Sequence, residues 1–316
     1  MEPHKFLAIL GPTGSGKSEL ALRVAARVSG EVVNCDSLQM YRYFDIGTAK
    51  LTISERQGID HHLIDVLDPD QVFTAGEYAR LARGVLAEIS ARGGVPVVAG
   101  GTGFYFRALL DGLFPGPARD QALRDRLAAR ERRKPGSLFR LLRRFDFEAA
   151  RRIHPHDLPK LTRAVEVCLL TRHGMTELFG EGRDALQGFR VLKIGLSPPR
   201  DELYQRIDRR SAEMFEGGLI EEVRATLARG FTPAVKPFES HGYRQALQLL
   251  NGELTLKEAI FYTQRNTRRY AKRQMTWFRQ EQGMNWFSGF GGDPQIQQAV
   301  IARVREFLSP SESSRN

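Results

Sequence analysis

Eight residues near the start of the chain combine glycines with a lysine and a serine at the spacing G-x-x-x-x-G-K-[ST]. Glycines let successive backbone N–H groups face one concavity, and the start of a helix adds partial positive charge there. The lysine supplies a mobile ammonium group, and the serine supplies a hydroxyl for Mg²⁺. The pattern predicts a polyphosphate site, against the alternative of a Gly-rich turn that binds nothing. The eight residues are Gly11, Pro12, Thr13, Gly14, Ser15, Gly16, Lys17 and Ser18.

The segments on either side must hold this loop in place. Lys5–Leu10 is a short apolar run typical of a buried strand, and apolar residues after Ser18 recur at the spacing of one helix face. Strand, loop and helix in this order are the context that a phosphate-binding loop requires. The motif alone does not specify a nucleotide.

Asp36 follows a second predicted buried strand, Glu31–Cys35. In an open α/β sheet, residues just beyond the carboxyl ends of strands face the ligand crevice, so we expect Asp36 near the phosphate-binding loop. A carboxylate there can support Mg²⁺ or act as a general base. A helix N-cap without chemistry is the alternative.

Three glycines and Thr102 follow another predicted strand, Val95–Ala99. Glycines at a strand end allow the backbone to approach a ligand closely. Thr102 can place a hydroxyl in the same crevice as Asp36, so the two strand ends and the phosphate-binding loop form one predicted site.

Paired histidines begin a further predicted strand, His61–Val66. Adjacent residues on a strand point to opposite faces, so His61 and His62 cannot easily chelate one metal ion. A structural or hydrogen-bonding role is the interpretation that this geometry favours.

The chain is basic, with 47 Lys and Arg against 37 Asp and Glu and a net charge of +10. This charge suggests a polyanionic partner, although a generally basic composition is the alternative. Within Tyr262–Arg279, cationic residues recur every three or four positions with Tyr270 and Trp277 among them. Such a helix suits a nucleic-acid backbone with unstacked bases nearby, whereas a solvated amphipathic helix is the alternative.

The predicted elements describe an α/β protein: a P-loop NTPase-like parallel sheet flanked by helices, with a small all-helical insertion domain. The composition changes at Phe114–Pro117. The chain beyond it is Arg-rich with a helical period, and strand character returns near residue 189. We predict a discontinuous core, 1–113 and 189–308, a helical insertion, 114–188, and a disordered Ser-rich tail, 309–316.

A cytoplasmic protein is expected from composition, which is 41% hydrophobic and 27% charged. Cys35 and Cys168 are the two cysteines and are far apart, which argues against a disulfide framework. No apolar run approaches the roughly 18 residues of a membrane span. The start of the chain enters a core strand at once, which leaves no room for a signal peptide. Nothing in the sequence demands more than a monomer.

Several stretches taken together resemble the tRNA dimethylallyltransferase family, the isopentenyl-transferases that modify tRNA, in its bacterial form. The resemblance runs from about residue 6 to 287 and is carried most specifically by Asp36–Tyr41 and Asp45–Lys50. Besides these and the phosphate-binding loop, the matching stretches are His61–Asp65, Gly100–Tyr105, Ile153–Pro155, Arg163–Val167, Gly242–Gln245 and Lys272–Arg279.

This resemblance implies transfer of a dimethylallyl group from dimethylallyl diphosphate to the exocyclic amine of the adenosine 3′-adjacent to the anticodon, with release of diphosphate. The phosphate-binding loop would then hold a leaving group, and Mg²⁺ on Ser18 together with Lys17 would neutralise its charge. Asp36 would be the base for the amine, and Thr102 would orient both.

The resemblance also implies that the insertion, 114–188, and parts of the core bind the anticodon arm of the tRNA. The implied tRNA-binding residues are Asp36, Ser37, Leu38, Gln39, Thr102, Lys160, Arg163, Arg244, Lys272, Arg273 and Arg279, with Arg124 of the insertion as a further candidate. Two departures stand out: Pro159-Lys160 replaces the family's frequent Gln-Arg, and Ser240-His241 replaces small apolar residues. Lysine lacks the planar fork of arginine, so the contact at Lys160 is the least secure.

Two other functions fit part of the sequence. A small-molecule or nucleotide kinase would use the same loop, with the Arg-rich insertion as its lid. A non-catalytic RNA-binding protein would use the basic stripe alone.

Overall fold

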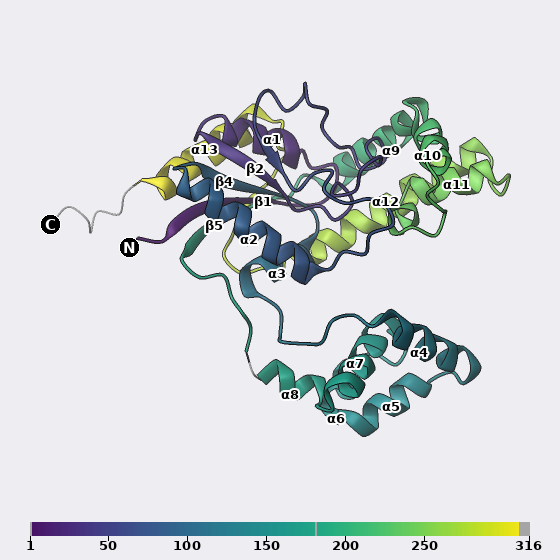
Figure 1. Cartoon of the computed structure of the whole chain (residues 1–316). Coiled ribbons are helices and arrows are strands. Elements are labelled where there is room, and N and C mark those ends of the chain that lie inside the picture. The colour runs from purple at the N-terminus through teal and green to yellow at the C-terminus, as the bar shows by residue number, and fades with distance from the viewer. Residues whose placement is uncertain (1, 181, 310–316) are drawn as a thin grey trace. The chain divides into compact units, whose positions relative to one another are not determined.

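A computed structural model of the chain describes residues 2–180 and 182–309 (Figure 1). The chain divides into a core unit, which runs up to Leu109 and resumes at Gln187, and an insertion, Leu110–Leu186. The predicted disordered tail, 309–316, lies outside the described residues except for Ser309. Within the described ranges, no helix combines the length and apolar character needed to cross a membrane.

The core unit is built on a sheet of six parallel strands in the order β3-β2-β4-β1-β5-β6. This confirms the predicted α/β fold class. β4 lies between β1 and β2, so the loops that follow these three strands emerge at one edge of the sheet. The strands are β1 His4–Leu10, β2 Gly30–Asn34, β3 His61–His62, β4 Val95–Gly100, β5 Phe189–Leu196 and β6 Met284–Phe287.

Helices cover both faces of this sheet (Figure 1). Leu7 and Ile9 of β1 pack with α1 and α13 on one face, and side-chain alternation places Phe6 and Ala8 on the face of α2 and α3. The core helices are α1 Lys17–Ala25, α2 Ala75–Ala91, α3 Gly103–Asp111, α9 Arg200–Glu216, α10 Leu219–Ala228, η1 Lys236–Glu239, α11 Tyr243–Leu250, α12 Leu256–Phe278 and α13 Pro294–Leu308.

Two strands differ from prediction. β3 is two residues long, because the chain leaves the extended conformation at Leu63 and Asp65, whose φ values are 61° and 56°. The predicted strand over His61–Val66 is therefore wrong beyond His62. β6, which has four residues, was not predicted, because so short a segment shows no clear period.

The insertion is a bundle of short helices around its own apolar core. Leu123, Leu127, Leu138 and Leu142, spaced for helices in the sequence, are all buried in that core. The helices are α4 Gln121–Arg133, α5 Ser137–Phe145, α6 Phe147–Arg152, α7 Leu158–Thr171 and α8 Met175–Gly180.

Candidate active site

The phosphate-binding loop joins β1 to α1 and takes its shape from glycines in the left-handed region. Gly14 and Gly16 have φ values of 82° and 84°. A Cβ atom on Gly16 would lie 2.8 Å from the amide nitrogen of Gly291, so a larger residue would displace the loop. The Lys17 ammonium group donates to the Pro12 carbonyl at 2.7 Å, which holds the cation against the loop.

A cavity of about 280 Å³ lies beside this loop. It is lined by the loop, the residues after β2, the end of β4, the segment 48–51 and helices α9 and α12, so distant parts of the core unit meet there. The lining residues are Thr13, Gly14, Gly16, Lys17, Ser18, Glu19, Asp36, Gln39, Thr48, Ala49, Leu51, Ala99, Gly100, Arg206, Arg210 and Gln274.

Positive charge is concentrated in this cavity. Burial lowers the pKa of Lys17 to about 8, the Asp36 carboxylate raises it in part, and Arg210 lowers it further. Burial, and then Arg206, also lower the pKa of Arg210. Besides burial, a neighbouring arginine thus lowers the pKa of each of these two cations, and a bound polyanion would raise both pKa values.

Arg206, Arg210 and Gln274 are site residues that the sequence analysis missed. Arg210 donates to the Thr13 hydroxyl at 2.7 Å, and the Gln274 side chain accepts from the Thr13 amide at 2.8 Å. The available signal was the i, i+4 spacing of the two arginines on a helix that follows a core strand. That spacing is also typical of a solvated helix face, so it did not identify them.

Neighbouring residues hold Asp36 just beyond the carboxyl end of β2. The Asn34 side chain accepts from the Asp36 amide at 2.9 Å, and one Asp36 carboxylate oxygen accepts from the Leu38 amide at 2.9 Å. Asp36 therefore caps a turn, and not the helix that the alternative interpretation proposed, and it also lines the cavity. Its negative charge influences Tyr270 of α12, since burial and then Asp36 raise the pKa of that phenol.

The Thr102 hydroxyl forms hydrogen bonds to Ser37 and not to Asp36. Its hydroxyl accepts from the Ser37 amide at 3.0 Å and donates to the Ser37 hydroxyl at 3.4 Å. Thr102 can therefore orient Asp36 only through the adjacent backbone. It does not line the cavity.

The cavity offers oxygen ligands for a divalent cation. Ser18, Glu19 and Asp36 all line it. Over residues 2–180 and 182–309, no cluster of three or more His, Cys, Asp or Glu side chains could hold a metal ion. Mg²⁺ is typically bound by one or two carboxylates together with substrate phosphates, so these residues fit a Mg²⁺ that arrives with a diphosphate.

The paired histidines have separate hydrogen-bonding roles. His61 Nδ1 lies 2.8 Å from the Ile59 carbonyl oxygen, and His62 Nε2 lies 2.6 Å from a Glu31 carboxylate oxygen. This agrees with the prediction that they do not share a metal.

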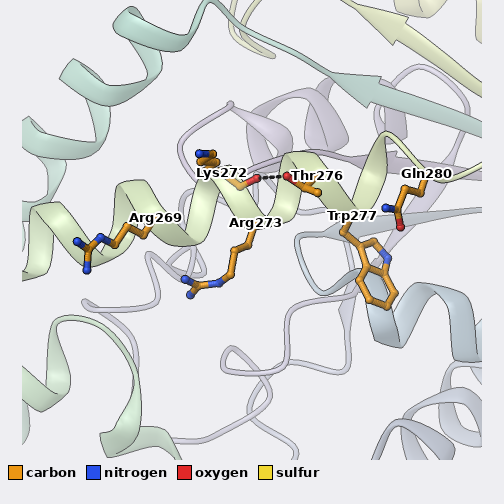
Figure 2. A pocket seen from close by; sticks show the side chains of 6 residues that line it. All are labelled: Arg269, Lys272, Arg273, Thr276, Trp277 and Gln280. Carbon is orange, nitrogen blue, oxygen red and sulfur yellow. Dashed lines mark hydrogen bonds between the residues drawn. The ribbon is translucent and has the colours of Figure 1, made fainter. Parts of the chain in front are cut away.

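A second cavity, of about 450 Å³, lies along the exposed side of α12 (Figure 2). Arg269 and Arg273 project to the same side of the helix, and Trp277 follows one turn later (Figure 2). The Arg107 guanidinium group stacks over the Trp277 ring at 4.5 Å, which fixes the indole. The lining residues are Arg269, Lys272, Arg273, Thr276, Trp277 and Gln280; Arg279, at the end of α12, is exposed.

Arg244 of α11 approaches the same helix around His241. Burial, Arg273 and Arg244 all lower the pKa of His241, so the imidazole is neutral at pH 7 and the two predicted tRNA contacts lie near one another. His241 also contacts Tyr270, with ring centroids 5.8 Å apart. A histidine at this position thus packs without adding charge.

In the insertion, two predicted contacts hold a buried carboxylate. Arg124 donates to both oxygens of Glu166 at 2.8 and 2.9 Å, and Arg163 donates to one of them at 2.7 Å. Burial alone would raise the pKa of the Glu166 carboxyl, but these arginines and the Asp120 amide lower it to about 2. Lys160 is exposed and pairs with Asp157 at 2.7 Å.

Known proteins resemble this chain along nearly its whole length. A relative from Solibacter usitatus, "tRNA dimethylallyltransferase", is 64% identical over 96% of this chain and 99% of its own. One of the same name from Koribacter versatilis is 56% identical over 98% and 100%.

Solved structures agree with these relatives. A tRNA isopentenylpyrophosphate transferase from Bacillus halodurans matches with a TM-score of 0.70 at 37% identity, over 96% of this chain and 95% of its own. A eukaryotic dimethylallyltransferase acting on tRNA matches with a TM-score of 0.82 at 27% identity, over 98% and 81%. The family model "IPP transferase" matches residues 39–281. The resemblance inferred from the motifs is confirmed: this chain belongs to the IPP transferase family.

Proposed function

We propose that the chain is a tRNA dimethylallyltransferase, which transfers a dimethylallyl group from dimethylallyl diphosphate to the exocyclic amine of the adenosine 3′-adjacent to the anticodon. The observation that carries this proposal is a cavity in which a phosphate-binding loop, two further arginines and the Asp36 carboxylate meet. Relatives that bear this name over nearly the whole chain support it.

The cations of the cavity act on the leaving group. As the bond between carbon and oxygen breaks, negative charge grows on the departing diphosphate. The loop amides, Lys17, Arg206 and Arg210 are already in place to stabilise that charge. The depressed pKa values of Lys17 and Arg210 return toward their ordinary range once the diphosphate is bound.

Asp36 is the proposed base. An aromatic amine is a poor nucleophile, so a carboxylate that accepts its proton as the new bond forms would raise the rate. Asn34 holds the backbone of Asp36, and Thr102 holds that of Ser37. The loss of either partner would misplace the carboxylate without removing it.

Ser18 would hold Mg²⁺ together with the diphosphate oxygens. When bound, the ion would supply further positive charge to the leaving group. The residues Gly11 to Ser18 would form the remaining diphosphate contacts through backbone N–H groups.

The anticodon arm is proposed to lie on α12 and the residues near it. Lys272, Arg273 and Arg279 are exposed on α12, and Arg244 is exposed on α11. Ser37, Leu38 and Gln39, next to Asp36, would contact the target adenosine, which must leave its stack to reach the base. In the insertion, Lys160 is the exposed candidate, while Arg124 and Arg163 would act chiefly by shaping that unit.

A reducing cytoplasm remains our proposal for the location of the protein. Cys35 and Cys168 are buried and free of any disulfide. Burial also raises the pKa of the Cys35 thiol to about 12, so it is unreactive.

One assay tests the function. Purified protein with Mg²⁺ should move label from dimethylallyl diphosphate onto unmodified tRNA with adenosine at that site, and Asp36→Asn should lower the rate by about 10²–10⁴-fold while tRNA still binds. ATP-dependent phosphorylation of a small molecule would instead establish the kinase alternative. Absence of transfer by wild-type protein would overturn the proposal, and unchanged transfer by Asp36→Asn would overturn the role of Asp36.

A further inference from the structure

The segment Asp45–Lys50 reaches the active-site cavity although it belongs to no helix or strand. Thr48 and Ala49 line the cavity, and Leu51 lines it immediately afterwards. A loop segment can form a defined wall only if other groups fix its backbone. The relevant question is therefore which residues hold it.

Two side chains from distant helices hold the start of this segment. One oxygen of Glu222 accepts from the amides of Asp45 and Ile46, at 3.0 and 2.9 Å. The Tyr243 hydroxyl accepts from the Gly47 amide at 3.0 Å and donates to the other Glu222 oxygen. Three successive backbone N–H groups are thus bound by Glu222 and Tyr243, which we call the clasp.

The fit around the clasp allows little freedom. A Cβ atom on Gly47 would lie 2.4 Å from Cε2 of Tyr243, so any larger residue at this position would clash with the tyrosine ring. Phe44 packs edge-on against the Tyr243 ring with centroids 4.8 Å apart. At the far end, the Lys50 ammonium group, whose side chain is 3% exposed, pairs with Asp45 and Asp65.

The held segment gives the cavity its apolar part. The Thr48 hydroxyl donates to the Phe44 carbonyl at 2.7 Å, so its polar atom is already satisfied by the segment itself. Beyond Leu51 and Ala99, a small cavity of about 30 Å³ continues to Val32 and Ile64, with Ser18, Asn34, Gln39 and His61 as its polar lining. The same site therefore combines cations for a diphosphate with apolar side chains for a short hydrocarbon chain.

We propose that Glu222 and Tyr243 are positioning residues, which hold the wall formed by Thr48, Ala49 and Leu51 against the prenyl chain and so limit the chain length that the enzyme accepts. The inference rests on the proposed function for its substrate, whereas the clasp itself is a property of the free protein. Neither side chain lines the cavity, so both act through the segment that they hold.

The kinetic test uses Tyr243→Phe and Glu222→Gln, assayed with dimethylallyl diphosphate and with the ten-carbon geranyl diphosphate. Each change removes or weakens hydrogen bonds to the segment, so KM for dimethylallyl diphosphate should rise about tenfold and preference over the longer donor should fall by a similar factor. We expect kcat to change by less than about threefold, since the base and the loop cations stay in place. Glu221→Gln is the matched control, because Glu221 is exposed on the same helix and pairs only loosely with Arg224 at 3.7 Å.

A second measurement needs no substrate. Hydrogen exchange at the amides of Asp45, Ile46 and Gly47 should quicken about tenfold in the two variants, and not in Glu221→Gln. Unchanged protection would overturn the clasp. Faster exchange without any change in KM or donor preference would overturn its link to the prenyl wall. If wild-type protein transfers no prenyl group, the proposed function fails, but hydrogen exchange still decides the clasp.

Discussion

Two pairs of arginines, one in each unit, have opposite electrostatic surroundings. In the core, Arg206 and Arg210 share a cavity with Lys17, and burial, followed by the charge of Arg206, lowers the pKa of Arg210. In the insertion, Arg124 and Arg163 both bind the fully buried Glu166. Within the described residues the first pair forms no ion pair, whereas both arginines of the second pair bind one carboxylate.

The difference shows that charge count does not locate an anion site. A basic sequence suggested polyanion binding in both units. The state of pairing separates them, because an arginine whose fork already holds a carboxylate has few donors left for a phosphate. The core arginines, which form no ion pair among the described residues, are therefore the better guide to the ligand.

The largest effect should follow from removing one of the core arginines. Arg210→Ala should lower kcat/KM for the prenyl donor by about 10²–10³-fold, since one preorganised cation on the leaving group is lost. Stability should change little, because the remaining cations repel one another less. Steady-state kinetics and thermal unfolding measure the two quantities.

Arg209→Ala is the control for that prediction. Arg209 lies on the same helix, is 71% exposed and reaches Glu213 only at 3.9 Å. Equal losses of activity in both variants would show that the helix, and not the charge at the cavity, is responsible.

The reverse outcome is expected in the insertion. Glu166→Gln should lower the free energy of unfolding of that unit by about 3 kcal/mol, because two partly buried guanidinium groups lose their carboxylate. Affinity for inorganic diphosphate should stay the same. Denaturation followed by hydrogen exchange in α7 measures the first, and calorimetry measures the second. Glu148→Gln, an exposed residue 3.5 Å from Arg151, is the control. A loss of diphosphate affinity in Glu166→Gln would contradict the contrast between the units.

Acid should reproduce this effect. The folded-state pKa of Glu166 is lowered from 4.5 to about 2, so its contribution to stability is present above about pH 4.5 and disappears as the pH falls through 2. An acid transition in the insertion that is present in wild type and reduced in Glu166→Gln is the expected result. Identical acid transitions in the two proteins would exclude Glu166 as the cause.

Base should act on the core through Lys17. Its pKa, about 8 in the free protein, should rise when a diphosphate binds. Between pH 8 and 10.5 the folded free chain holds fewer protons than the unfolded chain, so stability from this group rises with pH while diphosphate affinity falls, by at most about tenfold per pH unit. Calorimetry in buffers of different ionisation enthalpy should show proton uptake. Lys17→Arg, which stays charged, should not show it; equal uptake in both proteins would exclude Lys17.

The sequence was sufficient for the part of the site that lies at strand ends. Asp36 and the phosphate-binding loop follow β2 and β1, which both pair in parallel with β4 between them, so topology alone brings them to one edge of the sheet. Arg206 and Arg210 are more than 180 residues from the loop, and their helical spacing does not reveal which face meets the cavity. Thr102 lies beyond the end of β4 as expected, but its hydroxyl bonds to Ser37 and does not line the cavity, which depends on atomic distances that no sequence pattern carries.

The insertion shows a different limit. Its helices were evident from leucine spacing, yet Arg124 and Arg163 were predicted as tRNA contacts and not as partners of a buried carboxylate. Glu166 lies among valines and alanines of α7 and is fully buried. A carboxylate on an apolar helix face is a sign that cations approach it, because an unpaired buried charge is too costly. The position of Glu166 was visible in the sequence, and it indicates that nearby arginines pair with this carboxylate instead of facing solvent.

The smallest expected effect separates paired from unpaired arginines on one helix. Arg273 of α12 is exposed and forms no ion pair within the described part of the chain, whereas Arg268 is bound to Asp208. Arg273→Ala, like Lys272→Ala, should weaken tRNA binding by about three- to tenfold and reduce the slope of log affinity against log salt by about one. Arg268→Ala should leave that slope unchanged, because its charge is already neutralised. Filter binding over a range of salt concentrations measures both, and equal slopes for Arg268→Ala and Arg273→Ala would mean that pairing within the protein does not decide which arginines meet the RNA.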